Sequence, residues 1–273
     1  MPFDLTSYIR LYFNYMVRTI LLLAAVLMSL SGFCQGDIHN IQMVFVKGGT
    51  FYMGCDDKQY AASEFDNERP IHRVSISSYY IGKYEVTLKQ WKEVMGRTPP
   101  SYNGVEYGNK KCEECPVVKV DYDEILDFIK KLNDLNPGKH YRLPTETEWE
   151  FAARGGKYSH NYKYAGSNKI SEVAWYGKEN STTHIAGQKK PNELLIFDMT
   201  GNVSEWCSDW YDSTYYDKTI NALNPKGAEK GNKKVLRGGS YFDDDIVCRN
   251  VYRSHMLPKT KQWNIGFRLA YDN

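Results

Sequence analysis

Neither sign of charge is in clear excess in this 273-residue sequence, in which 35 basic residues face 33 acidic ones for a formal net charge of +2. Proteins that bind nucleic acid or anionic membranes usually carry basic patches. The charge balance therefore gives no reason to expect either partner. Repeats and low-complexity linkers are also missing after the first 40 residues, so we expect one domain over residues 40–273.

Long apolar runs are missing as well. An almost unbroken apolar stretch from Ile20 to Leu30 is too short to span a bilayer, which takes about 20 apolar residues. Arg18 precedes this stretch and small residues follow it, which is the pattern of a secretory signal. We expect residues 1–34 to be a signal peptide, with Met16 as a possible true start, and the mature chain to have no membrane span. The protein is then exported to the periplasm, the cell surface or the medium; lipid attachment at Cys34 or an uncleaved anchor is the alternative.

A second CxxC pair is lacking, and this weakens the case for zinc. Five cysteines follow residue 34, and an odd number leaves at least one that is free or that pairs between chains. Cys112 and Cys115 form a single CxxC in a polar loop, which is weak evidence for a zinc site on its own. We expect either a small loop disulfide or two free thiols at this position.

The patterns that are present predict a mixture of strands and helices. Strands are expected over residues 43–46 and 50–53, with Gly48 and Gly49 turning the first back into the second. Alternating apolar and polar residues predict another strand over 74–81.

Three helices are expected from their capping residues. The first begins after Thr87 and stops at Gly96, the second begins after Asp121 or Asp123, and the third begins after Thr145. On the second helix, one apolar face is expected to contain Ile125, Leu126, Phe128, Ile129 and Leu132. The fold class is α+β, with short strands and long loops in the second half of the chain.

Six further segments stand out by their composition and order: Met43–Gly54, Tyr84–Thr87, Tyr141–Glu150, Phe197–Trp206, Leu236–Tyr241 and Asn264–Arg268. Together they resemble the formylglycine-generating enzyme family, also called the sulfatase-modifying factor domain. The resemblance implies a single, irregular C-type-lectin-like domain with little regular secondary structure and a surface cleft. It is specific for the fold and much less so for the activity.

The segment from Asp198 to Glu205 has the composition of a calcium site. Its two carboxylates lie seven residues apart, and Gly201 lets the backbone turn tightly, so that the carbonyls of Gly201 and Val203 can point inward. Such hard oxygen ligands suit Ca²⁺. The resemblance implies a structural calcium ion held by these four residues; the alternative is a metal-free turn in which Asp198 caps backbone amides. A second calcium site of some family members wants an asparagine where this chain has Val173, so we expect one ion at most.

The segment from Gly238 to Arg249 bears on catalysis. In the active enzymes that this chain resembles, two cysteines bind copper(I), which activates oxygen to oxidise a substrate cysteine to formylglycine. Cys248 matches the second of these cysteines, whereas Asp243 stands at the first position. A carboxylate is a hard ligand that binds copper(I) poorly. Ser240 and Asn264 match the family pattern, so Ser240 and Cys248 are the candidate catalytic residues, and the alternative for Cys248 is a buried, apolar thiol.

Two functions stay open at this point. The first is a non-catalytic binding or scaffold module for a protein, a peptide, a glycan or a subunit of an envelope complex. Its cleft would carry the acidic residues 243–245 and four aromatic residues that could equally pack the core: Tyr241, Phe242, Tyr252 and Trp263. The second is a formylglycine-generating oxidase that acts on a cysteine of a sulfatase-type protein through Cys248. Iron chemistry is disfavoured because the six histidines show no HxxxH spacing.

Overall fold

The computed structural model describes residues 41–56, 67–102, 112–177 and 182–273. The expected signal peptide, its alternative start at Met16 and the lipid-attachment alternative at Cys34 lie outside these residues. Within the described ranges, none of the helices has the length and apolar character needed to cross a membrane.

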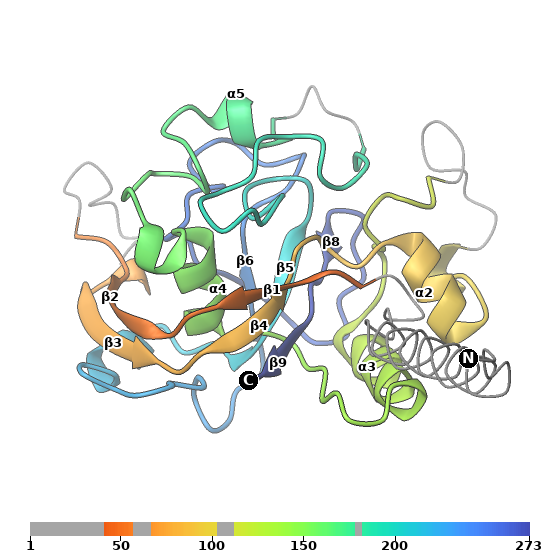
Figure 1. Ribbon diagram of the computed structural model, residues 1–273, viewed down its shortest axis with the longest axis horizontal. Coiled ribbons are helices and arrows are strands. Elements are labelled where there is room, and N and C mark those ends of the chain that lie inside the picture. The colour runs from red at the N-terminus through yellow and green to blue at the C-terminus, as the bar shows by residue number, and fades with distance from the viewer. Residues whose placement is uncertain (1–40, 57–66, 103–111, 178–181) are drawn as a thin grey trace, which may run out of the picture. The chain divides into compact units, whose positions relative to one another are not determined.

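Short elements joined by long irregular segments make up the described domain, as expected for an α+β, C-type-lectin-like fold (Figure 1). The strands are β1 (Met43–Val46), β2 (Gly49–Met53), β3 (His72–Ile76), β4 (Tyr79–Gly82), β5 (Ser204–Trp210), β6 (Lys234–Arg237), β7 (Ser254–Met256), β8 (Ile265–Gly266) and β9 (Ala270–Asp272). The helices are α2 (Leu88–Met95), α3 (Tyr122–Leu135), α4 (Glu146–Ala153) and α5 (Ile170–Val173), with short 3₁₀ turns at Pro100–Tyr102, Gly156–Tyr158 and Tyr215–Lys218.

The strands form three small sheets, and their pairing corrects two expectations. The sheets have the orders β1-β4-β9, β2-β3 and β7-β6-β5-β8. The first two strands therefore do not form a hairpin with each other, because β1 pairs with β4 and β2 with β3, both antiparallel. The single strand expected over 74–81 is also wrong, since the chain bends at Ser77 and Ser78 and separates β3 from β4.

The two bends that interrupt these strands pack against each other. The Gly48 amide donates a hydrogen bond to Ser78 Oγ at 3.0 Å. A Cβ atom on Gly48 would lie 2.4 Å from the carbonyl oxygen of Ile76, so a residue without a side chain is required there. The chain therefore bends at the same level between β1 and β2 and between β3 and β4. In place of two long paired strands there are two short pairs in different sheets, β1 with β4 and β2 with β3.

The helices begin where the capping residues predicted. Thr87, Asp121 and Thr145 each accept a hydrogen bond from the third residue of their helix and complete a capping box with it. Gly96 closes α2 in the left-handed conformation. The face expected for α3 is wrong at one residue: Leu126 is 45% exposed, and the buried face contains Tyr122 with Ile125, Phe128, Ile129 and Leu132.

The sheet of β5 and β6 separates two parts of the core. Trp206 and Leu236 pack with α2 and α3, whereas Cys207 and Val235 pack with α4, because successive side chains of a strand point to opposite faces. A third, smaller cluster contains Cys248 and lies against α5. This arrangement places the two candidate sites, 198–205 and 238–249, at the same end of the β5–β6 pair, because the start of β5 lies opposite the end of β6 in the antiparallel register.

Candidate functional site

The turn from Asp198 to Glu205 is a buried polar centre. Asp198 has a left-handed backbone (φ 55°), and its Oδ2 accepts a 2.6 Å hydrogen bond from the Gly187 amide. Its other oxygen, Oδ1, is buried and has no hydrogen-bond partner within the described part of the chain. Gly201 has a φ of 76°, and a Cβ atom there would lie 2.2 Å from the carbonyl oxygen of Trp175. Glycine is therefore required at the tight turn that the sequence analysis placed there.

Glu205, the second carboxylate of this segment, is held by an ion pair. Arg268 donates from Nε and from a terminal nitrogen to the two carboxylate oxygens, both at 2.6 Å. The indole nitrogen of Trp149 donates to Glu205 Oε2 at 2.7 Å. All three side chains are buried. These three bonds use three of the roughly four lone-pair directions of a carboxylate and fix its orientation.

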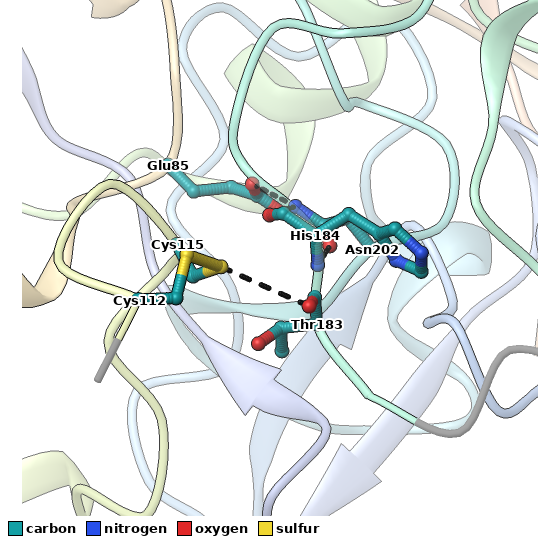
Figure 2. Close-up of a disulfide and its surroundings, with 6 residues drawn as sticks. All are labelled: Glu85, Cys112, Cys115, Thr183, His184 and Asn202. Atoms are coloured by element: carbon teal, nitrogen blue, oxygen red, sulfur yellow. Dashed lines mark hydrogen bonds between the residues drawn. A yellow bond between two sulfur atoms is a disulfide. The ribbon is translucent and has the colours of Figure 1, made fainter. Parts of the chain in front are cut away.

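A third carboxyl group, Glu85, was not expected at this centre. Its Oε2 accepts a hydrogen bond from Asn202 Nδ2 at 2.8 Å (Figure 2). Its Oε1 accepts a hydrogen bond from the Val203 amide at 3.2 Å, so Glu85 supports the turn from within. Glu85 lies in the segment Tyr84–Thr87, one of the segments that carry the family resemblance, and this was the available signal. Burial, with the charges of Asp198 and Glu205, raises the pKa of Glu85 well above its usual range.

The centre offers a free carboxylate oxygen for a cation, although within the described residues no group of three or more acidic, histidine or cysteine side chains is arranged to hold a metal ion. Three buried carboxyl groups interact electrostatically with the single guanidinium of Arg268: those of Glu85, Asp198 and Glu205. Burial raises the pKa of Asp198 to about 6, which is the response of a carboxyl that lacks a sufficient positive partner. The unpartnered Oδ1 of Asp198 is an oxygen of the kind that Ca²⁺ binds.

The second candidate site is built around Cys248. Its side chain is fully buried among Tyr164, Ile170, Val173 and Ala174. The sulfur lies close to the backbone, and a Cβ atom on Gly239 would approach it to 2.6 Å, which explains the glycine before Ser240. Burial and the nearby Asp243 carboxyl raise the pKa of the Cys248 thiol, so the sulfur stays protonated at neutral pH.

Asp243 is part of a hydrogen-bonded group with the two residues that match the family pattern. The Ser240 hydroxyl donates to Asp243 Oδ2 at 2.5 Å and accepts from Asn264 Nδ2 at 3.1 Å. Burial raises the pKa of Asp243. The structure thus brings Ser240, Asp243, Asn264 and Cys248 together, although they come from two separate segments of the chain.

The donor set at Cys248 does not fit copper(I). A cuprous ion prefers two soft sulfur ligands, and Asp243 offers a hard oxygen. Cys207 cannot replace the missing sulfur, because it packs in the core cluster of α4 and not in that of Cys248. Cys112 and Cys115 are joined in a disulfide, one of the two states expected for this CxxC pair.

The aromatic residues near this site divide between core and surface. Tyr241 is buried, and Trp263 packs edge-on against Tyr102 beneath the Lys119 ammonium. Tyr252 is partly buried. Phe242, in contrast, is 53% exposed.

The acidic residues that follow Phe242 are also divided. Asp245 is paired with Lys163 at 3.5 Å and accepts the Tyr164 hydroxyl, whereas Asp244 is exposed. A pocket of about 400 Å³ elsewhere on the domain is lined by residues such as Arg142 and Lys226, and none of the expected site residues contributes to it.

A family model described as "Sulfatase-modifying factor enzyme 1-like domain" matches residues 34–273. The chain belongs to this family. Among the curated relatives of this chain, the Chaperone protein LppX of Paenibacillus barcinonensis is 36% identical over 211 residues, which cover 62% of this chain and 71% of that protein. The formylglycine-generating enzyme of Streptomyces coelicolor is 36% identical over 174 residues, or 58% of this chain. The match spans 52% of that enzyme, about half its length.

A solved structure agrees with this family fold. Treponema denticola variable protein 1 superimposes with a TM-score of 0.73 at 29% identity, over 85% of this chain and 95% of that one. Relatives of this chain thus have names that denote different functions, an enzyme and a chaperone among them. Family membership therefore defines the fold of this chain, and the site residues must decide between the activities.

Proposed function

We propose that this chain is an exported, non-catalytic binding module of the sulfatase-modifying factor family. The observation that carries the proposal is the Asp243 carboxyl, which occupies the first cysteine position and is engaged by the Ser240 hydroxyl at 2.5 Å. An oxygen at this position leaves the buried Cys248 thiol without a second sulfur. The same bond keeps the Ser240 hydroxyl from acting freely on a substrate.

The ligand that we propose is a protein or peptide segment. Phe242 and Asp244, which flank Asp243 in the sequence, are both exposed, and they combine an apolar ring with a negative charge. Such a surface suits a segment with apolar and basic side chains. The name of the relative LppX, a chaperone protein, supports a protein ligand; a glycan and a partner subunit of an envelope complex are the other candidates.

A structural calcium ion belongs to the proposal. Asp198 Oδ1, the carbonyls of Gly201 and Val203, and Glu205 would hold it, while Arg268 and Trp149 keep the Glu205 carboxylate in place. The ion would supply positive charge to a centre in which carboxyl groups outnumber the guanidinium. Its role is to stabilise the turn and the adjoining strand β5, without any part in a reaction.

One assay separates the binding module from the oxidase. The purified chain is incubated with copper, a reductant and a Cys-x-Pro-x-Arg peptide of the sulfatase type, and mass spectrometry follows the loss of the peptide thiol. We expect no conversion by the native chain. Turnover that disappears in Cys248→Ala would refute the binding-module proposal and assign the oxidase activity to Cys248.

Ligand binding is tested with matched variants of the exposed surface. Peptide arrays that contain basic and aromatic segments are probed with the native chain and with Phe242→Ala. We expect Phe242→Ala to weaken binding about tenfold or more, because an exposed aromatic anchor supplies much of the energy of such an interface. Leu195→Ala, at an exposed residue of another loop (63% exposed), is the control and should bind as the native chain does.

Export is tested independently of the ligand. The mass of the mature N-terminus in a secreting host should correspond to cleavage after Cys34. Incorporation of a labelled lipid at Cys34 would replace this part of the proposal with lipid anchoring.

A further inference from the structure

The Cys112–Cys115 disulfide (Figure 2) closes a loop of only four residues, and this loop docks on the start of α2. A cross-link between residues so close in sequence removes little freedom from the unfolded chain, compared with one that joins distant segments. Stabilisation of the fold is therefore a weak reason for this bond. Its surroundings indicate a chemical role.

The loop is held in place without the disulfide. The amides of Leu88 and Lys89, in the first turn of α2, donate to the carbonyl oxygens of Cys115 (2.9 Å) and Glu113 (2.8 Å). The carboxylates of Glu113 and Glu114 are paired with Lys92 and Lys89, respectively. These contacts involve backbone and charged groups and are independent of the sulfur atoms. Breaking the disulfide would therefore leave the two cysteines close together and ready to reoxidise.

The two sulfur atoms differ in accessibility. Cys112 is partly exposed, whereas Cys115 is only 6% exposed. Attack on a disulfide requires an approach to one sulfur in line with the bond that breaks. An external thiolate can therefore reach Cys112, with Cys115 as the leaving group on the inner side.

A hydrogen-bond acceptor is already in place for the reduced form of Cys115. The sulfur of Cys115 lies 3.8 Å from the carbonyl oxygen of Thr183 (Figure 2). In the disulfide this sulfur carries no hydrogen and cannot donate, but a Cys115 thiol could donate to that oxygen.

The segment that supplies this acceptor is fixed from both sides. The His184 amide donates to Asn202 Oδ1 at 2.9 Å, and the Ala186 amide donates to the carbonyl oxygen of Glu114 at 3.2 Å. The Thr183 carbonyl therefore keeps its position whichever state the cysteines adopt. The site accommodates the dithiol as well as the disulfide.

We infer that Cys112 and Cys115 form a reversible thiol–disulfide exchange site for low-molecular-weight thiols. A thiolate attacks Cys112 Sγ, the Cys112–Cys115 bond breaks, and Cys115 leaves as a thiolate that takes a proton from water. A second thiolate attacks the sulfur of the first thiol in the mixed disulfide, which releases the external disulfide and a Cys112 thiolate. Two external thiols are thus oxidised to one disulfide while the protein disulfide is reduced to a dithiol.

The full chain in glutathione buffers of varied thiol-to-disulfide ratio tests this inference. Free thiols are alkylated under native conditions, the remaining disulfides are reduced and alkylated with a heavier reagent, and the peptide that contains both cysteines is analysed by mass spectrometry. We expect the reduced fraction to follow the ratio reversibly, with an unchanged circular dichroism spectrum. A bond that resists millimolar glutathione until the protein is denatured would show a purely structural disulfide and overturn the inference.

Two single-cysteine variants test the direction of attack. In Cys115→Ser the partly exposed Cys112 should form a mixed disulfide with oxidised glutathione about tenfold faster, or more, than Cys115 does in Cys112→Ser. Circular dichroism establishes that both variants are folded, and the buried Cys207 serves as the unreactive reference in each. Equal rates for the two variants would contradict the assignment of Cys112 as the attacked sulfur.

Discussion

A single side chain, Asp243, sets the chemistry that is open to this domain. It stands 2.5 Å from the Ser240 hydroxyl and close enough to Cys248 to raise the pKa of that thiol. The rest of the group, Ser240, Asn264 and Cys248, agrees with the family pattern. The missing sulfur should therefore be restorable by one substitution.

We expect Asp243→Cys to bind one copper(I) ion at least about 100-fold more tightly than the native chain, because it supplies the second soft ligand. Competition with a chromogenic copper(I) chelator measures the affinity. Asp243→Ser, which has similar size but no sulfur, and the double variant Asp243→Cys with Cys248→Ala should bind as weakly as the native chain. Equally tight binding by the native chain would show that the site does not need the second cysteine.

Another residue-scale effect concerns Asp209 on β5. It is fully buried beside Glu146, and burial followed by the Glu146 charge raises its pKa to about 7. An aspartate in the unfolded chain has a pKa of about 4. Between roughly pH 4 and 7, the Asp209 carboxyl therefore binds more protons in the folded state than in the unfolded state. The contribution of Asp209 to stability therefore falls as the pH rises through this window.

The variant Asp209→Asn removes this dependence, because its amide oxygen can accept the same two hydrogen bonds, from the Glu146 amide and the Ser208 hydroxyl. We expect it to be as stable as the native chain near pH 4 and roughly 1–3 kcal/mol more stable at pH 8, since one pKa unit corresponds to about 1.4 kcal/mol. Urea unfolding at several pH values measures the difference. A difference that is constant over the pH range would mean that Asp209 does not titrate in this window.

At the scale of elements, the periodicity of α3 predicts most of its buried face, but the packing decides which residues on that face are in fact buried. Ile125 is fully buried, whereas its neighbour Leu126 is 45% exposed. We expect Ile125→Ala to cost about 2–5 kcal/mol of stability, as deletions in a packed core do. Leu126→Ala should cost less than about 1 kcal/mol. Chemical denaturation compares the two variants directly, and equal losses would contradict the assignment of the buried face.

The same contrast shows how far the elements could be predicted. Helix starts were predictable at Thr87, Asp121 and Thr145, since a capping box lies within four residues of sequence. The pairing of β1 with β4 was not, because the bend at Gly48 depends on a backbone contact with residues 76–78. Local signals predicted where helices begin, and distant contacts decided how the strands pair.

The candidate site follows this rule too. The turn at Gly201 and the position of Cys248 were evident in the sequence. Glu85 was not assigned a role, because its hydrogen bond to the Val203 amide joins residues 118 apart. Arg268, in the last of the family segments, likewise meets Glu205 across 63 residues. The sequence motifs identified each segment. Which of their charged side chains pair with one another could be seen only in the folded structure.

On the scale of the whole molecule, that charge balance makes a prediction about calcium. Glu85 comes from a part of the chain distant from the segment that contains Asp198 and Glu205, and Arg268 joins the C-terminal segment to them. An ion bound among them would stabilise the folded state in proportion to its concentration over its dissociation constant, by about 2.7 kcal/mol at a hundredfold excess. For a domain of this size we expect EGTA to lower Tm by about 5–10 °C.

The pH dependence of this shift identifies the residue responsible. Without an ion, Asp198 titrates with a pKa of about 6, so protons compete with calcium below that pH. The Tm gained when Ca²⁺ is added to calcium-depleted protein should therefore be full at pH 8 and small at pH 5. Asp198→Ala, which removes both side-chain oxygens from the centre, should melt at the same temperature with and without added Ca²⁺ at both pH values. Native chain that melts identically in calcium and in EGTA at pH 8 would mean that no ion binds at this centre, and that the turn is held by Glu85 and the Glu205–Arg268 pair alone.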